Sequence, residues 1–156
     1  MSKNTGTPSE RIFVATLEKY WRKKVFIFRL ADAAAAFGRT GRLGLKDKQP
    51  SDYIITENGE MYYAEMKSST DKSRFALKNI SSGQIGAAKR QIAAGGKYYF
   101  YLHQLSDDRW FKVPAQVLLD TNKSSIRWDE LGSYAWELYN EVHGLHGGSG
   151  DHRDAA

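Results

Sequence analysis

The sequence predicts a single α/β domain, and three features of the chain lead to this fold class. Residues 52–67 have the pattern of a β-hairpin with Asn58-Gly59 at its turn, and residues 81–94 that of a capped helix. Residues 98–102 are an apolar strand candidate that follows a Gly-Gly stop. With 156 residues, 41% of them apolar, the chain is long enough for one core and too short for a second full domain.

The first element is predicted to be a helix from Thr7 to about Lys23. We expect Thr7 as its N-cap, Pro8 at the first helical position and Glu10 completing a capping box. An apolar strand is predicted next, over residues 24–30.

Residues 38–50, GRTGRLGLKDKQP, are predicted to form a basic loop inserted before the hairpin, after a stretch over 31–37 that is compatible with a helix. Glycines mixed with basic residues suit a loop that approaches phosphates, and a plain connector is the alternative. The basic side chains in this loop are Arg39, Arg42, Lys46 and Lys48.

The hairpin places two carboxylates opposite each other. An Asn-Gly pair between alternating apolar residues is typical of a type I′ turn, and a two-residue loop pairs Glu57 with Glu60 and Asp52 with Glu65. Opposed residues on one face have Cβ atoms about 4.5–5.5 Å apart, where like charges are destabilising. Lys67 lies two residues beyond Glu65 and therefore shares its face. One end of the hairpin thus gathers two acids and one amine.

The C-terminal half is predicted to contain shorter elements. Residues 68–78 are expected to be a polar, basic loop, residues 111–113 a strand and residues 114–119 a short helix. Residues 128–142 carry apolar side chains at helical spacing, which predicts a helix used in the core or at a subunit contact.

The domain is predicted to span residues 1–142, followed by a disordered Gly- and His-rich tail over 143–156. His143 and His146 do not predict a metal site, because no carboxylate on ordered structure accompanies them.

Composition limits the compartment and the chemistry. The chain has no cysteine, which excludes disulfides, thiolate metal sites and cysteine nucleophiles. The N-terminal residues carry no apolar signal region, and no run of 18 apolar residues exists. We expect a soluble, cytoplasmic protein that is not embedded in a membrane.

Charge is distributed unevenly. Residues 1–97 contain 18 Lys and Arg against 9 Asp and Glu, whereas residues 98–156 contain 5 against 9. A basic part that also holds the acidic hairpin favours a polyanion as partner, and a solvated charged surface is the alternative.

Opposed carboxylates have three common explanations: they share a proton, bind a hard cation, or stay at an exposed strand end where salt screens their repulsion. Mg²⁺ typically uses one or two carboxylates, several waters and phosphate oxygens of the substrate. A neighbouring Lys would hold or activate the attacking water. This combination favours metal-assisted hydrolysis of a phosphodiester.

Asp52, twelve intervening residues and then Glu65-x-Lys67 form the D…ExK signature of the PD-(D/E)xK nuclease superfamily. The segments PSDY, YYAEMKSST and RFALKNISSGQIGAAKRQIAAGGKYYFYL resemble the RecU-type Holliday junction resolvases of that superfamily. The resemblance implies a restriction-endonuclease-like core, in which a mixed central β-sheet is flanked by helices.

The resemblance is close over residues 50–105 and loose over the N-terminal helix. It weakens between residues 29 and 49, where those enzymes carry a longer basic stalk, and Gly83 stands where a His is expected before the Gln.

The resemblance assigns roles to individual residues. Asp52 and Glu65 would bind Mg²⁺, or Mn²⁺ in its place, with the carbonyl of Met66 as a further candidate ligand. Lys67 would orient or activate the water, or stabilise developing charge. Gln84 would help to position water or the backbone phosphate.

Two further assignments leave alternatives open. The first helix would supply another acid, for which Glu10 is the first choice and Glu18 the second; the capping box already explains Glu10 structurally. Ser51 would either brace the phosphate and the metal ligands or simply form the turn before Asp52.

The resemblance also implies the substrate and the assembly. A four-way DNA junction has approximate two-fold symmetry, so a C2 homodimer would present two sites and make paired symmetric nicks. DNA recognition would depend mainly on branch shape and strongly on salt. The alternatives are another PD-(D/E)xK DNase of the nicking or restriction type, or a non-catalytic DNA-binding protein. Beyond the loop, the expected phosphate contacts are Lys72, Arg74 and Lys78.

Overall fold

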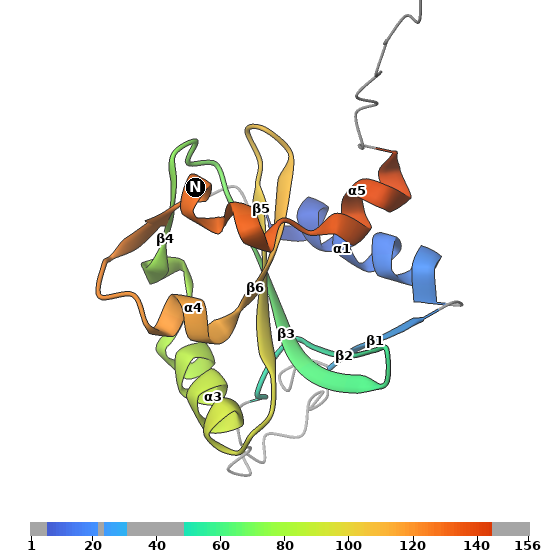
Figure 1. Cartoon of the computed structure of the whole chain (residues 1–156), viewed down its shortest axis with the longest axis horizontal. Helices are drawn as coiled ribbons and strands as arrows, with labels where there is room; N and C mark the ends of the chain where they lie inside the picture. Colours follow the sequence, from blue (N-terminus) through green and yellow to red (C-terminus); the bar gives the residue numbers. More distant parts are fainter. Residues whose placement is uncertain (1–5, 22–23, 31–48, 145–156) are drawn as a thin grey trace, which may run out of the picture.

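The computed structural model describes residues 6–21, 24–30 and 49–144. They form a mixed five-stranded sheet, in the order β1-β2-β3-β5-β6, with helices on both of its faces (Figure 1). The predicted α/β fold with a mixed central sheet is therefore confirmed. The strands of this sheet are β1 (Val25–Arg29), β2 (Tyr53–Glu57), β3 (Glu60–Ser69), β5 (Tyr98–Gln104) and β6 (Arg109–Pro114). The α-helices are α1 (Gly6–Trp21), α3 (Ser82–Ala93), α4 (Ala115–Leu119) and α5 (Glu137–His143).

The sheet is mixed because one strand pair is parallel. β1, β2 and β3 pair antiparallel in sequence, as do β5 and β6, whereas β3 and β5 run parallel. A parallel pair needs a long crossover, and here that crossover carries α3. The N-terminus of α3 lies beside the middle of β3, where Glu65 is.

The hairpin has the predicted register. Glu57 pairs with Glu60 and Tyr53 with Ala64. The turn residues Asn58 and Gly59 have φ values of 52° and 81°, the positive values that a type I′ turn requires.

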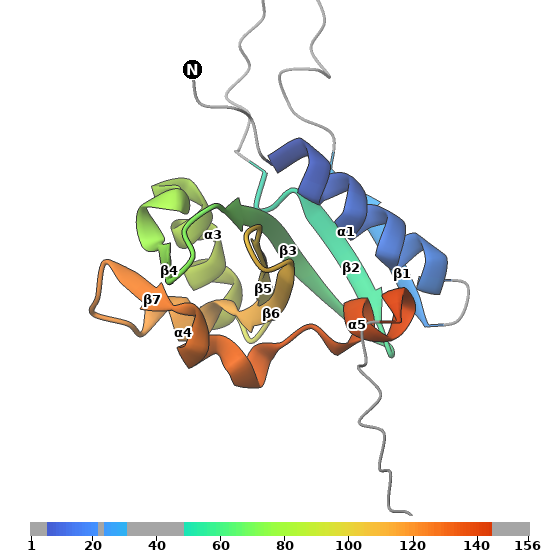
Figure 2. The ribbon, with the colours of Figure 1, turned by 90° about the horizontal axis from the view of Figure 1, so that it is seen from above.

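The two faces of the sheet have separate apolar cores. Figure 2 shows α1 and α5 on one side of the sheet and α3 and α4 on the other. Phe100 and Leu102 of β5 belong to the core under α3 and α4, and Tyr101 belongs to the core under α1 and α5. Glu65 is in register with Phe100 and Lys67 with Leu102, so both point to the α3 face. The period of two in β3 thus directs Glu65 and Lys67 away from α1.

α1 differs from the prediction at its start. The helix begins at Gly6, so Thr7 and Pro8 lie within its first turn and Thr7 is not the residue that precedes the helix. Proline fits because the first-turn N–H groups have no intrahelical acceptor. The helix ends at Trp21, and Lys23 lies outside the described residues.

The prediction of a loop over residues 68–78 was wrong in part. β3 continues to Ser69, and β4 (Arg74–Ala76) pairs with β7 (Ser125–Arg127) in a separate two-stranded sheet. A 3-10 helix, η1 (Leu77–Asn79), then leads to α3. Strands of three residues are too short for an alternating pattern to reveal them.

The single helix predicted over residues 128–142 was also wrong. A 3-10 helix, η2 (Trp128–Tyr134), is separated from α5 by an extended stretch. There Ala135 forms a bridge with Phe111, and the Trp136 N–H donates to the carbonyl of Trp110 at 2.9 Å. Pairing with β6 interrupts the helix that the spacing of the apolar residues predicted. The side chains of Trp128, Leu131 and Trp136 are still buried, the first two in the core under α3 and the third in the core under α1.

The predicted boundary between the domain and the C-terminal tail differs from the structure by one residue, His143. His143 closes α5, and its Nε2 lies 2.8 Å from Thr16 Oγ1, so it is not part of a tail. Residues 145–156 and the predicted helix and basic loop over 31–48 lie outside the described residues. Within the described parts of the chain, no helix has the length and apolarity needed to cross a bilayer.

Candidate metal centre and active site

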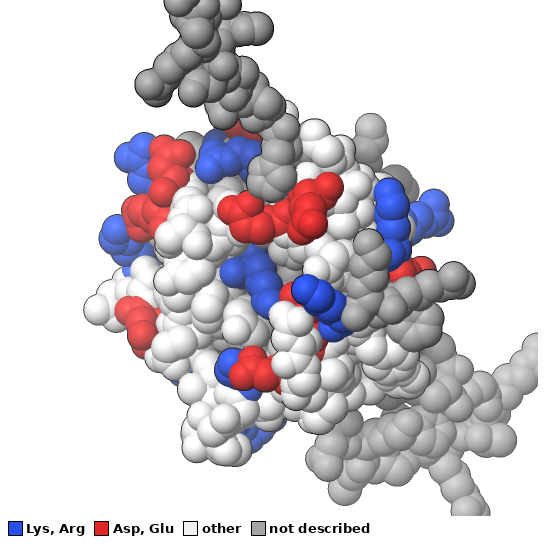
Figure 3. Space-filling view, turned by 45° about the vertical axis from the view of Figure 1, so that its right-hand side comes forward, with Lys and Arg blue, Asp and Glu red and all other residues white. Residues whose placement is uncertain are grey.

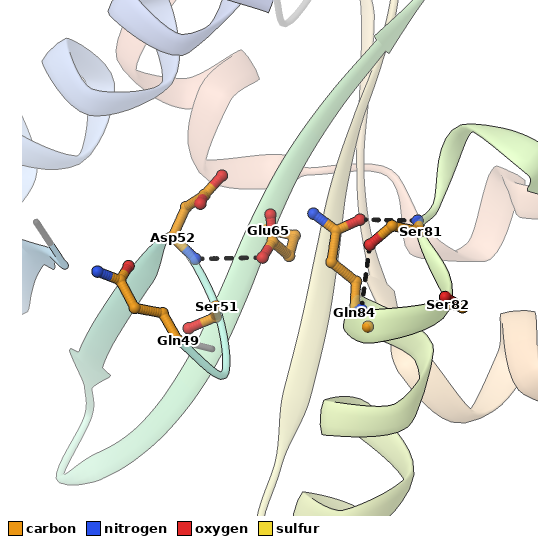
Figure 4. Close-up of a pocket in the computed structure, with 8 residues that line it drawn as sticks. Gln49, Ser51, Asp52, Glu65, Ser81, Ser82 and Gln84 are labelled. Atoms are coloured by element: carbon orange, nitrogen blue, oxygen red, sulfur yellow. Dashed lines mark hydrogen bonds between the residues drawn. The ribbon is translucent and has the colours of Figure 1, made fainter. Parts of the chain in front are cut away.

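A hollow of about 200 Å³ lies between the N-terminal end of β2, the middle of β3 and the first turn of α3 (Figure 4). One wall comes from the segment before β2 and from β3, and the opposite wall comes from the start of α3. Asp52, Glu65 and Gln84, predicted from distant parts of the sequence, meet there. The lining residues are Gln49, Ser51, Asp52, Glu65, Ser81, Ser82, Gly83 and Gln84.

Glu65 is the buried acid of this hollow, with 2% of its surface exposed. Its Oε1 accepts a hydrogen bond from the backbone N–H of Asp52 at 3.2 Å, whereas its Oε2 is buried and has no partner among the described residues. Burial raises the pKa of the Glu65 carboxyl to about 8, the neighbouring Asp52 carboxylate adds to the rise, and the Lys67 ammonium opposes it. The Lys67 ammonium and the Asp52 N–H therefore offset only part of the cost of burying the charged form of this acid.

A divalent cation fits this pair of acids. A buried carboxylate oxygen without a hydrogen bond is unfavourable unless a cation or proton satisfies it. Among the described residues no group of three or more His, Cys, Asp and Glu is placed to hold a metal ion. Two carboxylates are nevertheless the set that Mg²⁺ commonly uses, with water and substrate oxygens filling its other positions.

The segment before Asp52 is held in place by two hydrogen bonds. Ser51 Oγ donates to the carbonyl of Tyr53 at 2.7 Å, and Tyr98 Oη donates to the carbonyl of Pro50 at 2.7 Å. Ser51 thus takes part in the turn before Asp52; because it also lines the hollow, its role toward phosphate stays a prediction. Burial raises the pKa of the Tyr98 phenol, and the carboxylates of Glu65 and Asp52 raise it further. Sequence reasoning missed Tyr98, because an aromatic residue in a strand looks like any core residue.

Lys67 and Met66 continue β3 beyond its pairing with β2. The last pair of that ladder is Tyr53 with Ala64, so the backbone of Met66 lies on the part of β3 that β2 does not cover. The Met66 side chain is buried in the core under α1. Lys67 is half-buried on the same face as Glu65, and it does not line the hollow itself.

The side-chain amide of Gln84 has a hydrogen-bond partner for its oxygen and none for its nitrogen within the described part of the chain. In the capping box of α3, Gln84 Oε1 accepts from the Ser81 N–H at 3.0 Å, and Ser81 Oγ accepts from the Gln84 N–H at 3.2 Å. The bond to a backbone N–H fixes which amide atom is oxygen. The amide nitrogen therefore faces Glu65 across the hollow (Figure 4).

Glu10 and Glu18 are not brought to this hollow. They line a second one, of about 470 Å³, on the α1 side of the sheet together with Arg29 and Tyr53. Glu10 Oε2 lies 4.0 Å from Arg29 Nη2. Tyr53 is 1% exposed and its hydroxyl lacks a partner among the described residues; burial and then Glu10 raise the pKa of this phenol to about 12.

The predicted phosphate contacts are only partly described. Lys72, Arg74 and Lys78 are exposed, on the β3–β4 connection, β4 and η1 respectively. On the face seen in Figure 3, Lys and Arg are interspersed with Asp and Glu and form no continuous basic patch. The four basic residues of the predicted loop, Arg39, Arg42, Lys46 and Lys48, lie outside the described residues.

Comparison with known proteins identifies the fold. No family model and no curated protein matches the sequence. Among solved structures, the chain is similar to Hjc, a Holliday junction resolvase from the archaeal hyperthermophile Archaeoglobus fulgidus, with a TM-score of 0.56 and 18% identity. The match covers 85% of this chain and 98% of that one. It does not test the resemblance to RecU-type enzymes, which stays a prediction. At this identity the match shows a shared fold: the chain has the mixed α/β fold of this archaeal resolvase.

Proposed function

We propose that the protein is a Holliday junction resolvase, a metal-dependent DNA endonuclease that nicks four-way junctions in symmetric pairs. The observation that carries the proposal is Glu65, a buried carboxylate with one oxygen bonded by the Asp52 amide and the other unpartnered among the described residues, beside a second acid. A cation would satisfy such a pair, and Lys67 stands on the same strand face. The fold shared with an archaeal junction resolvase supports the same reading.

Asp52 and Glu65, with the carbonyl of Met66, would hold Mg²⁺, and Mn²⁺ is expected to substitute. The bound cation would polarise a phosphoryl oxygen and lower the pKa of a bound water. Lys67 would donate to that water or to a phosphate oxygen, and the amide nitrogen of Gln84 would donate to the same group of oxygens.

Glu10 remains a proposed catalytic residue, because the resemblance implies an acid from the first helix. Glu10 lines the second hollow, on the other face of the sheet from Glu65, and this position argues against Glu10 as a third direct ligand of the metal. Comparing Glu10→Gln with Glu18→Gln decides between the two acids: the participating one is expected to lose nicking, and the other to retain it.

The substrate and the assembly follow from symmetry and charge. We propose branched DNA as the partner and a homodimer as the active form, since each chain brings one carboxylate pair to a two-fold symmetric junction. The basic residues proposed to contact phosphates are those of the 38–50 loop with Lys72, Arg74 and Lys78. Phosphate contacts position DNA without reading bases, so branch shape would determine selectivity.

The decisive experiment incubates a labelled four-way junction with the protein and Mg²⁺, beside a linear duplex of the same sequences. Ca²⁺ and Asp52→Asn serve as controls that keep binding. Symmetric nicks on the junction alone, lost in the variant, are the expected result. Equal cutting of the duplex would instead indicate a general PD-(D/E)xK DNase. Binding without nicks in Mg²⁺ or Mn²⁺ would indicate a non-catalytic DNA-binding protein.

A further inference from the structure

The first turn of α3 has two backbone donors left over. A helix leaves the N–H groups of its first turn without intrahelical acceptors, and a capping box satisfies two of them. Here those two belong to Ser81 and Gln84. The N–H groups of Ser82 and Gly83 have no acceptor among the described residues, and both residues line the hollow.

The opposite wall of the same hollow carries Glu65 Oε2, unpartnered among the described residues, on a side chain that is 2% exposed. Figure 4 shows Asp52 and Glu65 on one side and the start of α3 on the other, with open space between them. A volume of about 200 Å³ is several times the roughly 30 Å³ that one water occupies. The hollow therefore has an acidic wall that favours a cation and a donor wall that favours an anion.

We propose that the N-terminus of α3 binds a DNA phosphate, with the backbone N–H groups of Ser82 and Gly83 as donors, across the hollow from Asp52 and Glu65. This inference rests on the proposed function and adds to it the group that fixes the substrate phosphate. Two aligned N–H groups and the positive end of a helix dipole favour an anion at this place. A cation held by the two acids would remove their repulsion of the phosphate.

Ser82 offers a way to delete one donor without disturbing the helix. Ser82 is the first helical residue, where proline is favoured because its missing N–H has no intrahelical role. Ser81 has φ −71° and ψ 156°, the extended conformation that a residue before proline prefers. Ser82→Pro therefore removes the donor and keeps the fold, whereas Ser82→Ala keeps the donor and removes only the hydroxyl.

The first test measures the affinity of both Ser82 variants for an intact four-way junction in Ca²⁺. We expect Ser82→Pro to bind about tenfold more weakly than Ser82→Ala, the factor that one charge-assisted hydrogen bond commonly supplies. Melting temperatures of the two variants verify that both are folded. Equal affinities in two folded variants would overturn the proposal.

Gly83 supports a second test with a matched control. A Cβ at Gly83 would meet only Ser81 Oγ, at 3.9 Å, and a Cβ at Gly86 would meet only Arg90 Nη1, at 3.5 Å. Both glycines tolerate alanine sterically, and both substitutions raise helix propensity alike. Gly83→Ala adds a methyl group beside the donor wall and is expected to weaken junction binding several-fold, whereas Gly86→Ala, outside the hollow, leaves it unchanged. Equal effects of the two would count against the proposal.

Amide NMR provides a readout that does not depend on cleavage. On titration with a thymidine dinucleotide in Ca²⁺, the amide signals of Ser82 and Gly83 are expected to shift, and those of Gly86 to remain. A shift with inorganic phosphate but not with the dinucleotide would contradict a phosphodiester site.

If wild type nicks junctions while Ser82→Pro and Ser82→Ala behave alike, only this inference fails. If no DNA is nicked and the two variants still differ in binding, only the catalytic function fails.

Discussion

At the scale of single residues, Glu65 combines features that seldom occur together without a ligand. It is buried, faces a second carboxylate and has one oxygen without a partner among the described residues. Its pKa of about 8 means that ionisation is unfavourable in the isolated protein near neutral pH. A cation at this place reverses that balance, because it favours the charged form.

Glu65→Gln tests this reading through stability. Glutamine has the same shape and can still accept from the Asp52 N–H, and it carries no charge to desolvate. The raised pKa costs wild type stability over the whole range from the ordinary value of 4.5 up to about 8, so in EDTA at pH 8 the variant is expected to unfold at the same temperature as wild type or higher. Adding Mg²⁺ or Ca²⁺ should raise the melting temperature of wild type only, since ligand binding to the native state stabilises by mass action. Equal metal-induced shifts in both proteins would place the cation elsewhere.

Which site residues were predictable depends on the physical rule behind each. The opposition of Asp52 and Glu65 follows from turn geometry and the period of two, both local properties of the chain. Gln84 followed from the resemblance, whereas its part in the capping box with Ser81 was not predicted. Tyr98 was not predictable, because its contact with Pro50 joins residues that only the crossover connection brings together.

At the scale of elements, α1 is connected to the β5–β6 turn by a polar network, in which Ser9 and His103 are buried and Asp108 is exposed. Ser9 Oγ lies 2.8 Å from His103 Nδ1, and His103 Nε2 lies 2.8 Å from Asp108 Oδ1. Because the carboxylate only accepts, Nε2 donates to it, and in the neutral ring Nδ1 accepts from the serine hydroxyl. Ser9 is fully buried, so these three residues form a structural clamp and not a nucleophilic triad.

The clamp predicts how stability changes with pH. Burial lowers the pKa of His103 below its usual 6.5, although Asp108 opposes the shift. The unfolded chain therefore binds a proton more readily than the folded protein as the pH falls below 6.5, and stability falls in that window. Glu65, with its raised pKa, changes the stability of both proteins equally over this range, so the test is the difference between them: between pH 8 and 5 the melting temperature of wild type should fall relative to that of His103→Gln. At pH 8 the substitution itself should lower the free energy of unfolding by about 1–3 kcal/mol, because it breaks this polar network. Parallel melting curves of both proteins across the range would refute the assignment.

Elements were predictable where the local pattern and the final packing agree. The hairpin and α3 carry strong turn and capping signals and appear with the predicted register and ends. β4 and β7 are three residues each and exist because they pair with each other across the fold. The break between η2 and α5 has the same origin, since Ala135 pairs with β6. A local sequence pattern carries no information about such long-range pairing, so these elements could not be predicted from it.

At the scale of the whole molecule, the basic residues are concentrated in the first 97 positions. Replacing Arg39, Arg42, Lys46 and Lys48 by glutamine keeps the length of the chain and removes four positive charges. We expect weaker junction binding, and the slope of log affinity against log salt should fall by about one for each phosphate that is no longer neutralised. A deletion of residues 38–48 should have a similar effect, and the metal-induced stabilisation should persist in both proteins. Unchanged affinity in the glutamine variant would show that these side chains do not contact DNA.

The last prediction concerns how many chains act on one junction. A chain supplies one pair of Asp52 and Glu65, whereas resolving a symmetric junction requires two nicks in strands of like polarity. If a homodimer acts, mixing wild type with Asp52→Asn should create dimers with one competent site. With a ninefold excess of the variant, random assortment makes such heterodimers about 18 times as abundant as wild-type dimers.

These mixtures should give junctions that carry a single nick, visible on denaturing gels, while native gels show few resolved duplexes. Wild type alone should give nicked and resolved products in parallel. Sedimentation of the free protein measures the dimer independently. If the ratio of resolved to nicked product is the same with and without the variant, each chain cuts alone, and paired cutting would have to arise from two monomers that bind opposite sides of the junction.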